Sequence, residues 1–129
     1  MSAIYDECEQ YQSFLEEKIT EEVESVIIKG NELAVIIARS GFMLAEAKQE
    51  LRKQLQTTMI DEIRTLAKET PFINQKALNT LIESLCRNEH FMVDWIERIN
   101  RTALHQLEYC RTLISLAKQE RYNSRTFNT

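Results

Sequence analysis

Several polar side chains near the carboxyl end of the chain have the types and spacing of a phosphate-binding set. Arg98, Arg101 and His105 are three and four residues apart, so a helix places them on one face, with Tyr109 at its edge. Arginine offers a planar fork of donors, histidine adds a donor that titrates near neutrality, and tyrosine adds a stacking surface. Asp94 shares this face, and its pairing with Arg98 would leave an ordinary salt-bridged surface instead. Both interpretations stay open.

Other polar side chains fall where a helix would bury them. Arg39 interrupts an apolar segment, and Lys48 continues the apolar stripe of the same helix, so each must meet a carboxylate, reach water or bind an anion. Gln106 projects into the apolar stripe of the last helix and must find partners. Convergent polar groups at a packed interface are typical of ligand sites. We predict a ligand site from these residues: Arg39, Lys48, Trp95, Asn100, Arg101, His105, Tyr109 and Arg111.

Motifs for catalysis or metal binding are absent from the sequence. His90 and His105 are far apart, and neither has the glutamate three residues earlier that a helical di-iron site needs. His105 and Cys110 lie about 140° apart around a helix, which separates them as a catalytic pair. We therefore predict no enzymatic activity, no metal site and no cofactor.

Composition favours an all-helical protein that stays inside the cell that makes it. Two glycines and one proline in 129 residues are too few for a β-sandwich or a glycine-rich nucleotide loop. The net charge of −4 argues against nucleic acid or anionic membranes as partners. Three widely spaced cysteines favour reduced thiols. The amino terminus does not resemble a signal peptide, and charges within the most apolar stretch, residues 26–47, argue against a membrane span.

The first expected element is an acidic helix within residues 1–25, which contain eight acidic side chains and one lysine. An ordinary helix face exposed to solvent gives the same charge pattern. A bend is expected at Gly30-Asn31. A second helix from Glu32 to Glu69 would be about 57 Å long, more than the width of a compact 15 kDa globule. Its core stripe is predicted from these residues: Leu33, Ala34, Ile37, Ala38, Gly41, Leu44 and Ala45.

The segment from Leu33 to Ala47 is apolar nearly all round, which is typical of helices buried on several sides. Four large residues face away from the predicted stripe: Val35, Ile36, Phe42 and Met43. Small residues at spacings of three and four would let another helix approach closely: Ala34, Ala38, Gly41 and Ala45. This helix is therefore either the centre of an oligomer or the central helix of a monomeric bundle.

The remaining chain predicts a short helix ending near Leu85, a turn at Asn88 to His90, and a last helix from Phe91 to Glu120. The core face of that helix is predicted from these residues: Met92, Ile96, Ile99, Ala103, Cys110, Ile114 and Ala117. Residues 121–129 are predicted to form a flexible tail. The predicted fold is an all-α, elongated bundle of about four helices forming one domain over residues 1–120, with long central and C-terminal helices, and oligomeric.

The strings LAVIIARSGFMLAEAK and LIESLCRNEHFMVDWIERINRTALHQLEYCRTLISLAK, with their spacing, resemble a family of small helical proteins of bacteriophages and prophages of gut bacteria and Firmicutes. The likeness covers roughly residues 30 to 120 and implies a phage protein acting in the bacterial cytoplasm, without a catalytic residue. The recurrent polar and aromatic positions of the family fall on these residues: Arg39, Ser40, Gly41, Lys48, Trp95, Asn100, Arg101, His105, Gln106 and Arg111.

One class of small phage proteins resembles what these residues suggest, namely oligomeric sponges that capture nucleotide second messengers of antiphage immunity. The expected ligand is a cyclic nucleotide or a cyclic ADP-ribose type molecule, with the cations neutralising phosphates, Asn100 reading polar edges and Trp95 or Tyr109 stacking on a base. Two alternatives belong to other classes. One is an accessory factor of phage nucleic-acid metabolism, and the other is a protein–protein adaptor that docks through residues 33–47.

Overall fold

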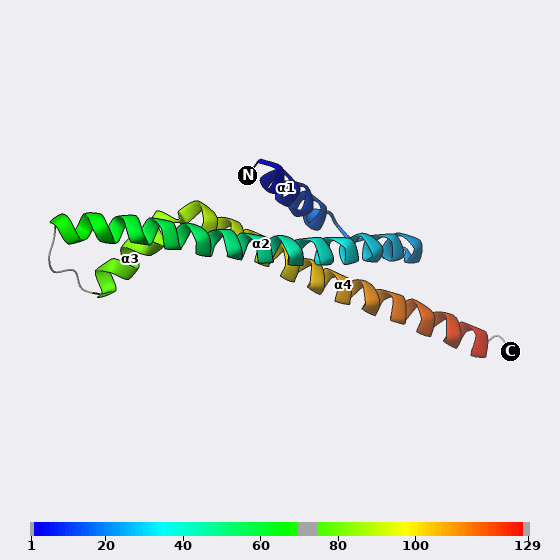
Figure 1. Ribbon diagram of the computed structural model, residues 1–129. Helices are drawn as coiled ribbons and strands as arrows, with labels where there is room; N and C mark the ends of the chain where they lie inside the picture. Colours follow the sequence, from blue (N-terminus) through cyan, green and yellow to red (C-terminus); the bar gives the residue numbers. More distant parts are fainter. Residues whose placement is uncertain (1, 70–74, 128–129) are drawn as a thin grey trace.

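The computed structural model describes residues 2–69 and 75–127, and helices dominate both ranges (Figure 1). Within them four helices follow in order: α1 (Ser2–Glu16), α2 (Val23–Glu69), α3 (Gln75–Leu85) and α4 (Arg87–Phe127). The long helices α2 and α4 pack along each other, α1 packs on α4, and α3 packs on α2. At 1.5 Å per residue α2 spans about 70 Å. The predicted all-α, elongated architecture with long central and C-terminal helices is confirmed.

The first break in the helical chain lies at residues 17–22, not at the bend predicted for Gly30-Asn31. Glu17 and Glu21 would lie one turn apart in a continuous helix, and like charges at that spacing weaken a helix. α2 then begins with a hydrogen bond from the Val26 amide to the Glu22 carbonyl. It continues through Gly30 because one interior glycine costs only about 1 kcal/mol, which packing along the helix offsets.

The buried face of α2 differs from the predicted stripe by a rotation of the helix. Ile36 and Met43, expected to face away from the core, are 5% and 1% exposed. Ala34, Ala38 and Ala45, expected inside the stripe, are exposed. Periodicity cannot define the inward face of a segment that is apolar all round. The inward face of α2 is set instead by the positions of α1 and α4.

The core face of α4 matches its prediction. Ile96, Ile99, Ala103 and Cys110 are buried, and the remaining predicted positions are half-buried. The turn before α4 lies at Cys86, slightly earlier than predicted, and α4 opens with a hydrogen bond from the His90 amide to the Cys86 carbonyl. The helix also continues beyond Glu120 to Phe127, so the described part of the predicted tail is helical.

Candidate functional site

The predicted ligand residues do not converge on one site, and the first of them, Arg39, is bound by α1. Its guanidinium donates two hydrogen bonds to the Glu7 carboxylate, from Nε at 2.9 Å and from Nη2 at 3.0 Å. This pairing lowers the pKa of Glu7 and raises that of Arg39. A cation in an apolar segment needs a carboxylate, water or an anion, and Glu7 provides the carboxylate for Arg39. The prediction that Arg39 belongs to an anion site is therefore not supported by its surroundings.

The side chain of Asn100 joins the two long helices. Its Nδ2 donates to the Ile37 carbonyl at 3.0 Å and lies 2.9 Å from Ser40 Oγ. Ser40 is fully buried, and its hydroxyl donates to the same Ile37 carbonyl. Both amide hydrogens are thereby directed to α2, and we assign Asn100 to the packing of α2 on α4 instead of to ligand reading.

Trp95 and Arg101 do lie together, in a shallow groove on the surface of α4. Two rings and four charged side chains line this groove: Phe91, Asp94, Trp95, Glu97, Arg98 and Arg101. The Trp95 ring contacts Phe91 at a centroid distance of 5.6 Å and Tyr5 of α1 at 5.2 Å, and its indole N–H donates to Gln12 Oε1 at 3.3 Å. Arg101 pairs with Glu97 one turn earlier, at 3.1 Å. The groove therefore offers a fixed aromatic wall beside cations that acids partly balance.

The other predicted site residues lie on open surface. His105 and Tyr109 are exposed on the outer side of α4, and His105 Nδ1 is 3.8 Å from Glu108 Oε2. Lys48 and Arg111 are also exposed, and within the described residues neither forms an ion pair or hydrogen bond. The prediction that Lys48 continues a buried stripe is wrong, because the buried face of α2 is rotated away from it.

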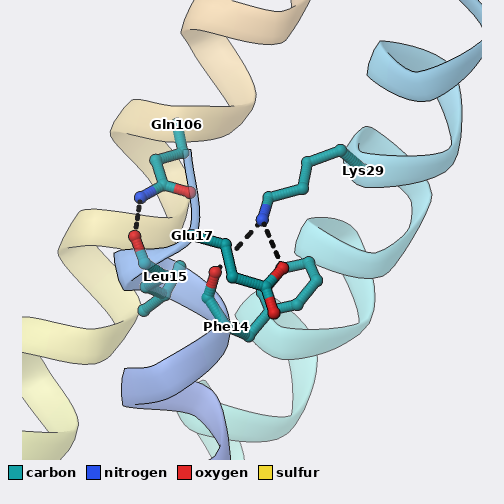
Figure 2. A network of polar contacts seen from close by, with 5 residues as sticks. All are labelled: Phe14, Leu15, Glu17, Lys29 and Gln106. Atoms are coloured by element: carbon teal, nitrogen blue, oxygen red, sulfur yellow. Dashed lines mark hydrogen bonds and ion pairs between the residues drawn. The ribbon is translucent and has the colours of Figure 1, made fainter. Parts of the chain in front are cut away.

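Two polar side chains that reach the end of α1 form a contact that the ligand prediction did not include (Figure 2). Lys29 of α2 donates to the Phe14 carbonyl at 3.1 Å, and its ammonium lies 3.7 Å from the centre of the Phe14 ring. Gln106 of α4 donates to the Leu15 carbonyl at 2.7 Å. The last carbonyls of a helix lack partners within the helix and carry negative partial charge. α2 and α4 therefore cap α1 from both sides.

A signal for this cap was present in the sequence. Lys29 lies three residues after Val26 and four before Leu33, both buried, so it shares their face of α2. A lysine on that face must direct its ammonium to an acceptor. Gln106 was recognised as a buried amide in need of partners, and its Nε2 finds one, while its buried Oε1 has none in the described structure. The identity of the acceptors depended on where α1 packs.

The three cysteines are buried and do not form disulfides. Cys8 lies on the buried side of α1, and burial raises its pKa to about 11. Burial also raises the pKa of Cys110. A thiol with a raised pKa is a poor nucleophile at neutral pH. Among the described residues no cluster of His, Cys, Asp and Glu side chains has the geometry to hold a metal ion.

Several apolar residues of α2 are exposed in the described structure, and we call the surface that they form the α2 face. Its large members are Ile27, Ile28, Val35 and Phe42, with exposed fractions of 46%, 60%, 65% and 57%. Exposed small residues lie between them: Ala34, Ala38, Gly41 and Ala45. Each of these four large residues is more than two-fifths exposed, and exposed apolar patches on a protein surface are often functional.

Comparisons of the chain with protein-family models, curated proteins and solved structures found no match. The resemblance to phage proteins therefore stays a prediction. In the described ranges, no helix has the length and apolar character needed to cross a bilayer.

Proposed function

We propose that the protein acts by binding and not by catalysis, as a helical adaptor whose α2 face docks an apolar helix of a partner. The observation that carries this proposal is the exposure of Ile28, Val35 and Phe42, which repeat every seven residues along α2. That spacing aligns their side chains along one side of a helix, which is the pattern by which helices pair. The alanines beside them allow a partner backbone to approach closely.

Photo-crosslinking from the α2 face tests this function. A photoreactive amino acid replaces Val35 in the full chain, in cells that naturally produce the protein, and irradiated samples are compared by gel and mass spectrometry. We expect a discrete crosslinked product from position 35. The matched control is the same replacement at Leu116, an apolar residue of α4 that is 50% exposed and lies outside the α2 face. Equal crosslinking from both positions, or none from position 35, would contradict an adaptor role.

A second candidate function is supported by the groove on α4. Phe91 and Trp95 offer ring surfaces beside the guanidinium groups of Arg98 and Arg101, which is a combination that binds a phosphorylated nucleotide. On this proposal the chain sequesters a cyclic nucleotide or a cyclic ADP-ribose type messenger in the bacterial cytoplasm, as a phage protein that evades antiphage defence. Asp94 and Glu97 oppose it, because they reduce the positive charge of the groove.

Calorimetry tests the nucleotide proposal at the groove. Wild-type protein and Arg98→Ala are titrated with a panel of cyclic mononucleotides, cyclic dinucleotides and cyclic ADP-ribose. Sequestration predicts saturable heat with wild type and at least a tenfold weaker affinity for the variant. Absence of heat across the panel removes the nucleotide proposal and leaves the adaptor proposal unchanged.

A further inference from the structure

Resting on the proposed adaptor function, we infer that the partner helix on the α2 face is the α2 helix of a second copy of this chain, in antiparallel orientation. The two copies would be related by a twofold axis near Val35. Ile28 and Phe42 are each seven residues from Val35, so an antiparallel pair places Ile28 of one copy against Phe42 of the other. The face is therefore self-complementary in the way that a twofold interface requires.

The exposed surface of the chain supports a partner of this size. The described chain exposes 9744 Å². A compact monomer of 15.2 kDa exposes about 7,100 Å², so the excess is about 2,600 Å². Permanent homodimers remove about 1,000 to 2,500 Å² from each chain. The excess therefore lies near the upper end of the area that one chain loses in a permanent homodimer.

Charge at the two ends of the α2 face favours the antiparallel orientation. Residues 20–25 carry three acidic and no basic side chains, whereas residues 45–50 carry two acidic side chains and one basic one, and all of these charged side chains are exposed. A parallel pair would bring the two acidic ends together. An antiparallel pair with its twofold axis near Val35 places each acidic end beside the other copy's less acidic residues 45–50, and it also opposes the two helix dipoles.

Mass measurement of the purified full chain is the first test. Light scattering after gel filtration should give a mass near twice 15.2 kDa for wild type. Val35→Glu adds a charge to the α2 face and should reduce the mass to that of one chain, with the helical circular dichroism retained because Val35 is exposed. The matched control Leu116→Glu should remain dimeric. A wild-type monomer at millimolar concentration, or a Val35→Glu variant that stays dimeric, would overturn the inference.

Paired cysteine variants test the relative orientation of the two α2 helices. They also keep the inference testable if Val35→Glu does not fold. Ile28→Cys and Phe42→Cys are mixed and oxidised, with the unsubstituted chain as the blank because its own thiols are buried. The antiparallel pair predicts disulfides between the two different variants. Two copies of one variant would hold their cysteines about 21 Å apart along the helix, too far to bond. Predominant linkage within each variant alone, or no linkage in any mixture, would contradict the inference.

These outcomes separate the inference from the function on which it rests. A photo-crosslinked product from position 35 with twice the chain mass agrees with both. A product of a different mass, together with a monomeric wild type, would reject the second copy and retain the adaptor. Failure of crosslinking at position 35 would reject both.

Discussion

At the scale of single residues, one cation of the predicted ligand site, Arg39, forms a contact between helices, whereas Lys48, His105 and Arg111 lie on open surface. Arg39 binds Glu7 and Lys29 binds the end of α1, so two of the positive side chains of α2 hold α1 in place. The amide of Asn100 similarly holds α2 on α4. These contacts predict measurable effects on stability.

The Glu7–Arg39 pair predicts a loss of stability in acid. Its carboxyl pKa is lowered from 4.5 in the folded state, so the pair contributes fully above about pH 4.5, and this contribution disappears as pH falls through the lowered pKa. Glu7→Gln should reduce the free energy of unfolding by up to about 1 kcal/mol at pH 7, because both side chains are partly exposed. Urea titrations followed by Trp95 fluorescence should show the difference from wild type narrowing below pH 4.5.

Glu9→Gln is the matched control for this prediction, since Glu9 is an exposed carboxylate of the same helix. It should leave the free energy of unfolding within about 0.5 kcal/mol of wild type. If the difference in free energy of unfolding between wild type and Glu7→Gln stays constant down to pH 2, the ion pair is not its cause.

Asn100→Ala should lower the free energy of unfolding by about 1 to 3 kcal/mol, because it removes two hydrogen bonds between α4 and buried groups of α2. Denaturant titration measures the change. Asn123→Ala, an exposed residue of α4, should cost less than about 0.5 kcal/mol. If both variants are equally stable, the Asn100 contacts do not hold the helices together.

At the scale of elements, α1 is attached by a few directed contacts. Cys8 and Leu15 are its buried residues, and caps from α2 and α4 fix its end (Figure 2). Elements with little buried apolar surface open locally at lower free energy than the global unfolding. We therefore expect α1 to be the first described helix to separate from the core.

Thiol labelling can detect this opening. In the folded chain Cys8 is buried and its pKa is about 11, so a maleimide should modify it slowly. Arg39→Ala removes the anchor of Glu7 and should speed modification of Cys8 severalfold, as measured by mass spectrometry of labelled peptides. Cys86, buried between α3 and α4, serves as the internal control. Equal acceleration at Cys8 and Cys86 would indicate global unfolding instead.

Because α2 continues as a helix through Gly30, we can predict how a methyl group added at this position changes the free energy of unfolding. A Cβ added at Gly30 would lie 3.7 Å from Leu107 Cδ1, an ordinary contact distance. Gly30→Ala should therefore raise the free energy of unfolding by about 0.5 to 1 kcal/mol, because alanine loses less entropy in a helix. Thermal or denaturant unfolding measures this. A decrease in stability would mean that the chain needs a bend at this position.

At the scale of the whole molecule, the elongated shape and the exposed α2 face predict that stability depends on protein concentration. Dimerisation favours the folded state by mass action, so the unfolding temperature of wild type should rise by about 5 °C over a hundredfold range of concentration. Val35→Glu should show no such rise in differential scanning calorimetry. A wild-type midpoint independent of concentration would argue for a monomer.

The sequence by itself determined the helical class, the two long helices and the inward face of α4. Two glycines and one proline are too few for the turns of a β-sheet protein, so the chain is expected to be helical. In α4, polar residues separate Ile96, Ile99 and Ala103 at helical spacing, and this pattern defines one buried side. It also indicated that Arg39 and Gln106 needed partners, because an uncompensated polar group in an apolar stripe is costly.

Tertiary structure alone decided which side of α2 is buried and which partners those polar groups have. In residues 33–47 every side is apolar, so many rotations of the helix bury similar area, and the contacts of Lys29 and Arg39 with α1 select one of them. The same selection leaves Val35 and Phe42 in solvent. Glu7, Phe14 and Leu15 are distant in sequence from the groups they bind, and only the packing of α1 brings them within hydrogen-bonding distance.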